Sequence, residues 1–329
     1  MNVESLKPPL NSDAAGLDAI FARRFVINAG KGGVGRSTVT AAMALLAAQR
    51  GKRVLVIELG SQERVPGLLG FAGKVGYAPT QVREGIEVIN VTPGPALHEY
   101  GLMKLKFERI YKIVFENPVM RSLTRMIPGM NELVLIGKAW FLEQERDTFG
   151  RPLWDLLLVD APATGHGVSL LDLPHVITES VKSGPLADEV GAIKAMLVDE
   201  RRTCMNIVTL PEEMPVRETL DLHRKMRETL HIAPGLLVLN GVYPELPSGE
   251  VVAATERLSR LPGPTQGLAQ AAAFLHERRR VQDTHRALLR EHCDLPMISL
   301  PYIFTSEFGP AAVAALAAAI LTAPIERAT

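Results

Sequence analysis

Residues 30–38 have the sequence Gly-Lys-Gly-Gly-Val-Gly-Arg-Ser-Thr, whose glycine spacing is that of a phosphate-binding loop. Glycines let the backbone turn tightly, so that successive N–H groups point inward at a di- or triphosphate. An apolar run at 25–28 precedes the loop, and a helical pattern of apolar residues follows it until Gly51. The N-terminus of that helix would face the same anion. The predicted nucleotide-binding residues of this loop are Gly30, Lys31, Gly32, Gly33, Val34, Gly35, Arg36, Ser37 and Thr38.

A carboxylate at the end of a second apolar run suits a magnesium ion beside this loop. Residues 154–160 form an apolar stretch that ends in Asp160, which is the Walker B pattern. Ser37 is placed to ligate Mg²⁺ directly, while Asp160 would hold its water shell. Arg36 stands where such loops usually have a lysine, and its fork can bind two oxygens although its reach differs. We therefore expect nucleotide binding, with slow turnover.

The composition is that of a protein with one large core. The chain has 329 residues, 47% of them hydrophobic, and 36 basic residues balance 36 acidic ones. Balanced charge argues against binding to nucleic acid or directly to an anionic membrane. Cys204 and Cys293 lie far apart without CxxC spacing, which excludes a disulfide scaffold and a four-cysteine zinc site. The first ten residues lack the apolar core of a signal peptide, so the expected location is cytoplasmic.

Apolar runs that are typical of buried strands alternate with helical segments along the chain. The runs cover residues 25–28, 53–58, 86–91, 156–160, 205–210, 236–240 and 297–300. This alternation predicts an α/β fold with a doubly wound, mainly parallel sheet. We expect a flexible tail at residues 1–20 and a single P-loop domain at residues 21–323. That domain would contain a helical insertion at about 96–147, and the three arginines at 278–280 would lie on a solvated helix face.

Several segments besides the loop carry a family resemblance. Asp160 opens the sequence Asp-Ala-Pro-Ala-Thr-Gly-His, residues 128–132 are Pro-Gly-Met-Asn-Glu, and residues 209–215 are Thr-Leu-Pro-Glu-Glu-Met-Pro. Asn240 ends a late strand. In this combination the chain resembles the ATPases of the arsenite-efflux pump and of tail-anchored-protein targeting over about residues 23–322.

The resemblance implies a Mg²⁺- and ATP-dependent ATPase that works as a homodimer or as a heterodimer with a paralogue. In that family the residue matching Lys31 reaches the partner subunit's phosphates, and the residue matching Asn240 recognises adenine. Gly60 and the segment Thr164, Gly165 and His166 match its switch regions, although His166 could equally be an orienting or capping residue. The ATPase cycle would act on a protein partner, with any membrane contact indirect.

Some positions depart from the family pattern. Gly60 stands where an aspartate normally orients the attacking water, and Glu58 could replace it, be salt-bridged, or join the Mg²⁺ shell. The candidate catalytic residues are therefore Lys31, Glu58 and Asp160. The zinc CxxC and the arsenite-binding cysteines are absent. Two alternatives stay open: a nearly inactive ATP-sensing subunit beside a hydrolysing paralogue, and a positioning ATPase of the partition type.

Overall fold

The computed structural model describes residues 14–60, 62–105, 129–245, 249–260, 263 and 266–327. Residues 1–13 of the predicted tail and residues 106–128 of the predicted insertion lie outside this range. Within the tail, the helix α1 (Ala14–Ala22) packs against the body, with Leu17 and Ile20 buried. The prediction of a flexible tail to residue 20 is therefore wrong for residues 14–20, because these apolar side chains complete the core beside α2.

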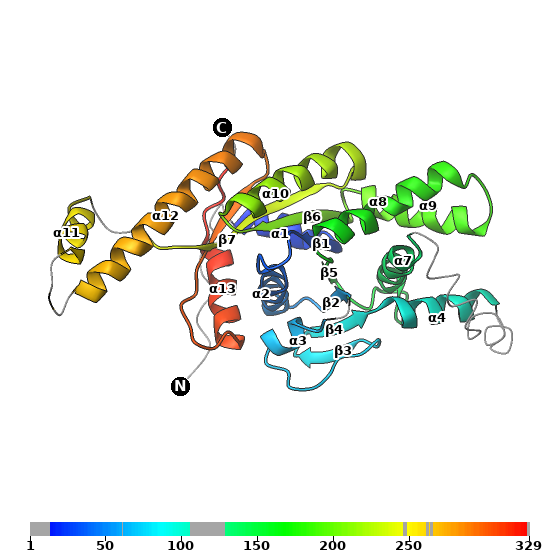
Figure 1. The fold of residues 1–329 in the computed structure, drawn as a ribbon. Coiled ribbons are helices and arrows are strands. Elements are labelled where there is room, and N and C mark those ends of the chain that lie inside the picture. Colours follow the sequence, from blue (N-terminus) through cyan, green and yellow to red (C-terminus); the bar gives the residue numbers. More distant parts are fainter. Residues whose placement is uncertain are drawn as a thin grey trace.

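The core is an eight-stranded sheet in the order β3-β4-β2-β5-β1-β6-β7-β8, parallel except for the edge strand β3 (Figure 1). The strands are β1 (Phe25–Ala29), β2 (Val54–Leu59), β3 (Thr80–Arg83), β4 (Ile86–Val91), β5 (Leu156–Asp160), β6 (Thr203–Thr209), β7 (Pro234–Val242) and β8 (Met297–Pro301). This confirms the predicted α/β fold class. The sequence missed β3, which is short and half exposed, so that no apolar run marks it.

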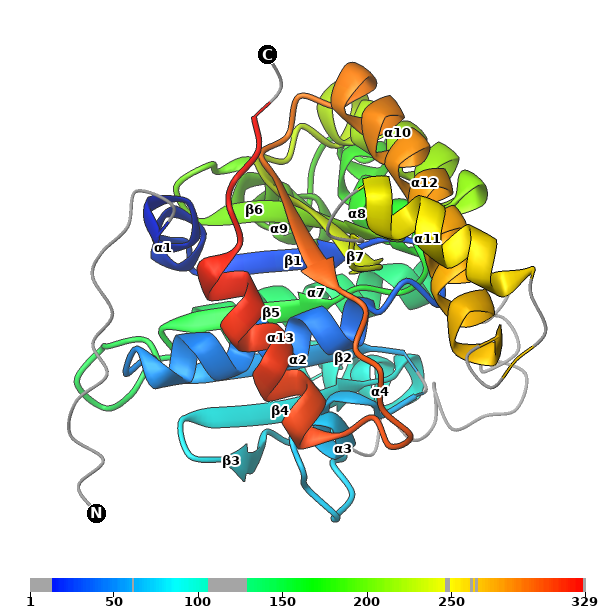
Figure 2. The ribbon, with the colours of Figure 1, turned by 90° about the vertical axis from the view of Figure 1, so that its left-hand side faces the viewer.

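Helices cover both faces of the sheet. Alternate residues of each strand belong to two separate hydrophobic clusters, so that Ile27 packs on one face and Val26 on the other. One face is covered by α7 (Met130–Gln144), α8 (Thr164–Ser180), α9 (Pro185–Val198), α10 (Glu213–Lys225) and the π-helix η1 (Met226–Leu230). The other is covered by α1, α2 (Arg36–Gln49), the short α3 (Val65–Leu68) and α13 (Pro310–Thr322), with α2 and α13 lying across the strands in Figure 2.

The register of the central strands aligns polar residues from neighbouring strands in one row. Asp160 of β5 is the partner of both Glu58 of β2 and Asn28 of β1, and Asn28 is in turn the partner of Asn206 of β6. All of these side chains are buried. Because carboxyl ends of parallel strands meet at one edge, this row lies where doubly wound sheets bind their ligands.

The described part of the predicted insertion is helical. It comprises most of α4 (Pro93–Leu105) and all of α7, whose apolar side packs on the sheet through residues such as Ile136 and Leu142. Together with α9, these helices enclose a cavity of about 520 Å³ with mainly apolar walls that include Met103, Met130 and Trp140. No helix in the described ranges is long and apolar enough to cross a membrane.

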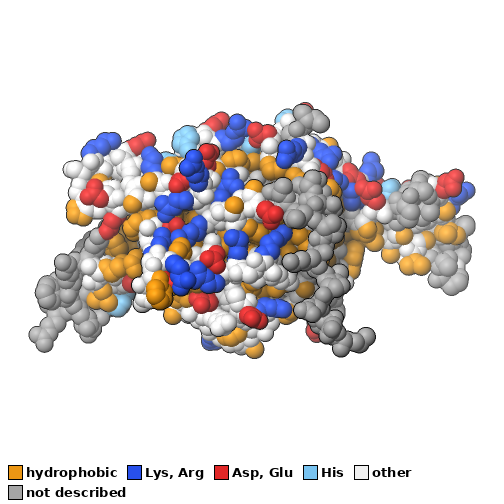
Figure 3. All heavy atoms as spheres, turned by 180° about the vertical axis from the view of Figure 1, so that it is seen from behind, with side chains coloured by type: hydrophobic (Ala, Val, Ile, Leu, Met, Phe, Trp, Pro, Cys, Tyr) orange, Lys and Arg blue, Asp and Glu red, His pale blue; other side chains and the backbone are white. Residues whose placement is uncertain are grey.

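At the opposite end, α11 (Gly249–Ser259) and the first half of α12 (Gln266–His292) project from the body (Figure 1). Here one prediction is wrong: Arg279 is buried rather than solvated, because its guanidinium binds the Tyr243 carbonyl and the carboxylates of Glu245 and Asp283. Phe274, by contrast, is 62% exposed. Seen from behind relative to Figure 1, the surface carries both Lys and Arg and Asp and Glu side chains (Figure 3), in line with the balanced composition.

Candidate functional site

The glycine loop connects β1 to α2 and passes close to two other strands. A side chain at Gly30 would place its Cβ 2.2 Å from the carbonyl oxygen of Val208 in β6. At Gly35, where φ is +86°, a Cβ would lie 2.2 Å from Nδ2 of Asn240 in β7. Both positions therefore require glycine. Gly30 is close to the backbone of β6, and Gly35 has a left-handed conformation in addition to its contact with the Asn240 side chain.

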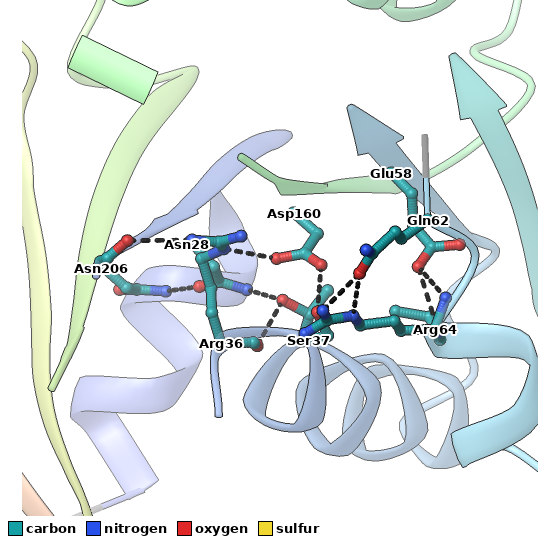
Figure 4. Close-up of polar contacts among 11 residues, drawn as sticks. Asn28, Arg36, Ser37, Glu58, Gln62, Arg64, Asp160 and Asn206 are labelled. Carbon is teal, nitrogen blue, oxygen red and sulfur yellow. Dashed lines mark hydrogen bonds and ion pairs between the residues drawn. The ribbon is translucent and has the colours of Figure 1, made fainter. Parts of the chain in front are cut away.

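Arg36, Ser37 and Asp160 form one interlocked group at the start of α2 (Figure 4). Nε of Arg36 donates to Oδ1 of Asp160 at 2.8 Å, and the Ser37 hydroxyl donates to Oδ2 at 2.6 Å. Nη1 of Arg36 also donates to the carbonyl of Gly30 at 2.9 Å, which ties the loop back on itself. A lysine could not make this fork, because its single nitrogen cannot reach both acceptors in this way.

Behind this group lies a polar network that the sequence analysis did not assign to the site. Asn28 donates through Nδ2 to the Thr40 hydroxyl at 2.9 Å, and Asn206 donates to Oδ1 of Asn28 at 2.9 Å. The Thr40 hydroxyl in turn donates to the carbonyl of Arg36 at 3.0 Å. These bonds fix the first turn of α2 on β1 and β6. The sequence signal for this network was an asparagine inside each of two apolar strands, Asn28 in β1 and Asn206 in β6.

Two predicted nucleotide-binding side chains make contacts within the chain. Nζ of Lys31 forms an ion pair with Oε1 of Glu218 in α10, at 2.9 Å. Nδ2 of Asn240 donates to the carbonyl of Val34 at 2.9 Å. Asn240 therefore braces the loop in this structure, and Lys31 lies at the cavity wall with its side chain 29% exposed.

Glu58 ends β2 with its side chain buried beside the phosphate loop. Its Oε1 accepts hydrogen bonds from the backbone N–H groups of Arg64 and Val65, at 2.7 and 2.9 Å, while Oε2 has no hydrogen-bond partner among the described residues. Burial raises the pKa of Glu58 from 4.5 to about 7, opposed by these N–H groups and reinforced by the nearby charge of Asp160. The carboxyl group therefore both starts α3 and leaves one oxygen for a further contact.

The loop after β2 differs from the family pattern in backbone and in side chains. Gly60 has a φ of +141°, a conformation that L side chains rarely adopt. Two residues further on, Gln62 lies at the cavity, and Arg64 follows with its Nε donating to Oε1 of Gln62 at 3.0 Å. The sequence analysis missed Gln62 and Arg64, because nothing in a short polar loop distinguishes side chains that face a cavity from those that face away.

The second switch segment begins α8. Gly165 is an exposed residue of its first turn, and the backbone of Thr164 and His166 is helical, while the side chains of these two residues lie outside the described part. Pro162 and Ala163 connect β5 to this helix and line the cavity. The helix that carries the predicted switch thus starts at the wall of the phosphate site.

The glycine loop, the start of α2, the ends of β2 and β5 and the segments that follow these two strands surround one cavity of about 670 Å³, within the usual range for small-ligand sites. Lys31, Arg36 and Arg64 supply positive charge to its described lining, and Glu58 and Asp160 supply negative charge. The other lining residues include Gly32, Gly33, Gly35, Ser37, Thr38, Leu59, Gly60, Gln62, Gly67, Leu68, Ala161, Pro162, Ala163 and Phe308. The parallel sheet, the glycine loop and the aligned carboxylates define the class of P-loop nucleoside-triphosphate-binding folds.

Comparison with known proteins shows which members of this class the chain resembles. The family model described as "Anion-transporting ATPase" matches residues 23–183. ATPase BagA of Mycobacterium tuberculosis is 28% identical over 223 residues, which are 64% of this chain and 63% of the relative. The arsenical pump-driving ATPase of Escherichia coli is 24% identical over 269 residues, covering 75% of this chain and 45% of the relative. ATPase ASNA1 homolog 1 of Paramecium tetraurelia is 24% identical over 163 residues, covering 48% and 46%.

These matches support the resemblance to the ArsA-like ATPases that the loop and the Asp160 motif predict. The chain spans about 63% of the length of BagA and less than half of the other two relatives.

Proposed function

We propose that this protein binds Mg²⁺ and ATP in the 670 Å³ cavity and hydrolyses the ATP. The observation that carries the proposal is the convergence of Arg36, Ser37 and Asp160 at the helix N-terminus behind the glycine loop. Loop N–H groups and a fixed cation stabilise phosphate charge, and phosphoryl transfer depends mainly on such positioning and electrostatics. The ATPase names of the relatives support the same reaction.

The donor set fits magnesium. The Ser37 hydroxyl and the Asp160 carboxylate lie 2.6 Å apart at the cavity, and Glu58 adds a buried oxygen that no described residue hydrogen-bonds. Hard oxygen donors in small number, completed by phosphate oxygens and water, are the ligands that Mg²⁺ takes in nucleotide sites. Ser37 would hold the ion and Asp160 its water shell. The ion would supply charge neutralisation at the phosphates.

We further propose that the working unit is a dimer, with Lys31 of each subunit directed to its partner's phosphates. Lys31 lies at the mouth of the site and is held in this structure by Glu218, an ion pair between part-exposed groups that costs little to break. The family resemblance supports this assembly, and a protein partner, bound according to nucleotide state, is the proposed recipient of the cycle.

Nucleotide binding is tested on purified protein by titration calorimetry and thermal unfolding with Mg·ADP and Mg·ATP. A ligand that binds only the folded state raises the melting temperature, and the rise grows with ligand concentration. At a hundredfold excess over Kd, the free energy of unfolding increases by about 2.7 kcal/mol. Release of phosphate from ATP is then measured at saturation. Absence of both heat and thermal shift at millimolar Mg·ATP would refute the proposal.

Assembly is tested with light scattering and Lys31→Ala. We expect ATP to favour the dimer. The variant should keep ADP affinity within a few-fold while losing turnover, because the missing contact is to the partner's phosphates. A monomer in the presence of ATP, both alone and with any paralogue, would reject the shared site.

A further inference from the structure

The loop after β2 brings two polar side chains into the phosphate cavity close to the position where the family's aspartate is missing. Gln62 and Arg64 both line that cavity, together with Lys31, Ser37 and Asp160. Figure 4 shows both side chains extending from the end of β2 toward the start of α2. Both side chains can therefore reach a ligand that is bound in this cavity.

The two side chains form one unit, here called the Gln62–Arg64 pair. Nε of Arg64 donates to Oε1 of Gln62 at 3.0 Å, and Nη2 donates to the same oxygen. The backbone beneath the pair is anchored, since Oε1 of Glu58 accepts the N–H of Arg64 at 2.7 Å. Both side chains are exposed, so that they can reorient toward a ligand while their backbone stays fixed to the strand end.

Arg64 is the cation of this lining whose hydrogen bonds go to a neutral partner. Arg36 is bound to the Asp160 carboxylate at 2.8 Å, and Lys31 to a carboxylate of α10 at 2.9 Å. If Nη2 of Arg64 moves from the amide oxygen to a phosphate oxygen while Nε stays on Gln62, Arg64 gains a charge-assisted hydrogen bond, which is roughly twice as strong as a neutral one. Arg64 is therefore the cation that a phosphate recruits at least cost.

We propose that Arg64 binds the terminal phosphate of ATP and that Gln62, held by Arg64, orients the attacking water. The inference rests on the proposed ATPase function and assigns to this pair the work that an aspartate at Gly60 would do. In the step, the water oxygen forms a bond to the terminal phosphorus while the bond from that phosphorus to the bridging oxygen breaks. The products are ADP and phosphate, and the released proton leaves with phosphate or to solvent.

The chemistry matches the groups present. A glutamine amide oxygen has two lone pairs, and in this structure Nε and Nη2 of Arg64 both donate to Oε1 of Gln62. Once Nη2 has moved to the phosphate, Oε1 can keep the bond from Nε and accept a hydrogen bond from water. Gln62 removes no proton, since its amide is not a base at neutral pH. A guanidinium placed at the transferring phosphoryl group stabilises its developing charge and is worth about 10³–10⁵ in rate where it has been measured, and a glutamine orients water in the same way in other nucleotidases.

The experiment compares wild type with Arg64→Gln, Arg64→Lys and Gln62→Ala, with Arg83→Gln as the matched control. Arg83 is an exposed arginine on the edge strand β3, away from the cavity lining. Affinities for Mg·ADP and for a non-hydrolysable Mg·ATP analogue are measured by calorimetry, and turnover is measured at saturating ATP. The binding arm reports on Arg64 even if turnover requires a second subunit.

We expect Arg64→Gln to leave ADP affinity unchanged, to weaken the ATP analogue about tenfold, as loss of a charged hydrogen bond does, and to lower turnover about 10²-fold or more. Arg64→Lys should recover analogue affinity but not turnover, because one nitrogen cannot hold both phosphate and Gln62. Gln62→Ala should lower turnover about 10²-fold with both affinities unchanged. Arg83→Gln should match wild type.

The failures are distinguishable. If wild type binds neither nucleotide, the proposed function falls and this inference falls with it. If wild type binds and turns over ATP but Arg64→Gln and Gln62→Ala retain its selectivity and rate, only the role of the pair is overturned. Equal loss of ADP and analogue affinity in Arg64→Gln would also overturn it, because the contact would then not be to the terminal phosphate.

Discussion

The two sides of the phosphate cavity are built differently. On the side of β1, α2 and β5, Arg36, Ser37 and Asp160 are nearly buried and bind one another through short hydrogen bonds. On the side of β2, Gln62 and Arg64 stand on an exposed loop and bind mainly each other. The first side agrees with the family motifs in all but Arg36, while the second has lost the expected aspartate at Gly60.

The difference teaches where such a site can change. Side chains at aligned strand ends are constrained by register, since Asp160 is the register partner of both Glu58 and Asn28. A replacement there disturbs several buried partners at once. A loop has fewer shared partners, so a new pair can take over a function without altering the sheet. We expect substitutions on the buried side to affect binding most strongly, and substitutions on the loop side to affect rate and pH response.

The largest effect is expected for Gly35→Val on the buried side. Its Cβ would lie 2.2 Å from Nδ2 of Asn240 at a φ of +86°, so the loop must distort. The thermal shift with Mg·ADP and Mg·ATP should disappear. Gly94→Ala in α4, where no atom lies within 4 Å of the added Cβ, is the control and should keep the full shift. A normal shift in Gly35→Val would show that the loop does not bind the nucleotide.

Arg36→Met should weaken both Mg·ADP and Mg·ATP about tenfold or more, because hydrogen bonds to charged groups contribute about 1.5–3 kcal/mol each. Calorimetry measures both affinities. Arg36→Lys keeps the charge and should fall between Met and wild type, since it cannot bind Asp160 and the Gly30 carbonyl together. Unchanged ADP affinity in Arg36→Met would mean that Arg36 only holds Asp160, and the contrast between the two sides would weaken.

Glu58→Gln should change the pH dependence of stability. The folded protein holds the Glu58 proton up to about pH 7, whereas the unfolded chain releases it near pH 4.5. The free energy of unfolding of wild type should therefore fall between pH 4.5 and 7, by up to about 3 kcal/mol from this group. The amide introduced by the substitution keeps an acceptor oxygen for the α3 N–H groups and does not titrate.

Thermal unfolding from pH 5 to pH 8 checks this: the variant should match wild type at the acid end and exceed it at the alkaline end. Glu84→Gln, an exposed carboxylate between β3 and β4, serves as the control and should follow wild type. Parallel curves for Glu58→Gln and wild type across the range would show that Glu58 is ionised throughout, which would favour a role at the metal.

The smallest effect is expected for Gly60→Asp. Space is available among the described residues, since none of their atoms lies within 4 Å of the added Cβ, but φ is +141°. Strain of this kind costs about 1–3 kcal/mol, so the melting temperature should fall by a few degrees. Gly60→Ala separates strain from charge and should fall equally. If turnover rises in Gly60→Asp but not in Gly60→Ala, the missing carboxylate limits the rate and the Gln62–Arg64 pair does not replace it.

The sequence by itself determined the parallel sheet, its predicted strands and the motif residues of the site. Strands buried on both faces need continuous apolar runs, and the runs ending at Asn28 and Asp160 are therefore visible without a structure. Glycine at residue 35 has a local backbone cause as well, its φ of +86°. In each case the physical requirement acts within a few neighbouring residues, so a short stretch of sequence records it.

Only the tertiary structure decided which distant groups meet. It placed α1 in the core, buried Arg279 against the end of β7 and the residues after it, paired Lys31 with Glu218, and turned Gln62 and Arg64 into the phosphate cavity. An exposed polar loop has the same local pattern whichever way its side chains point. Their direction follows from how β2 ends, where Glu58 binds the backbone of residue 64, and from the helix that lies opposite.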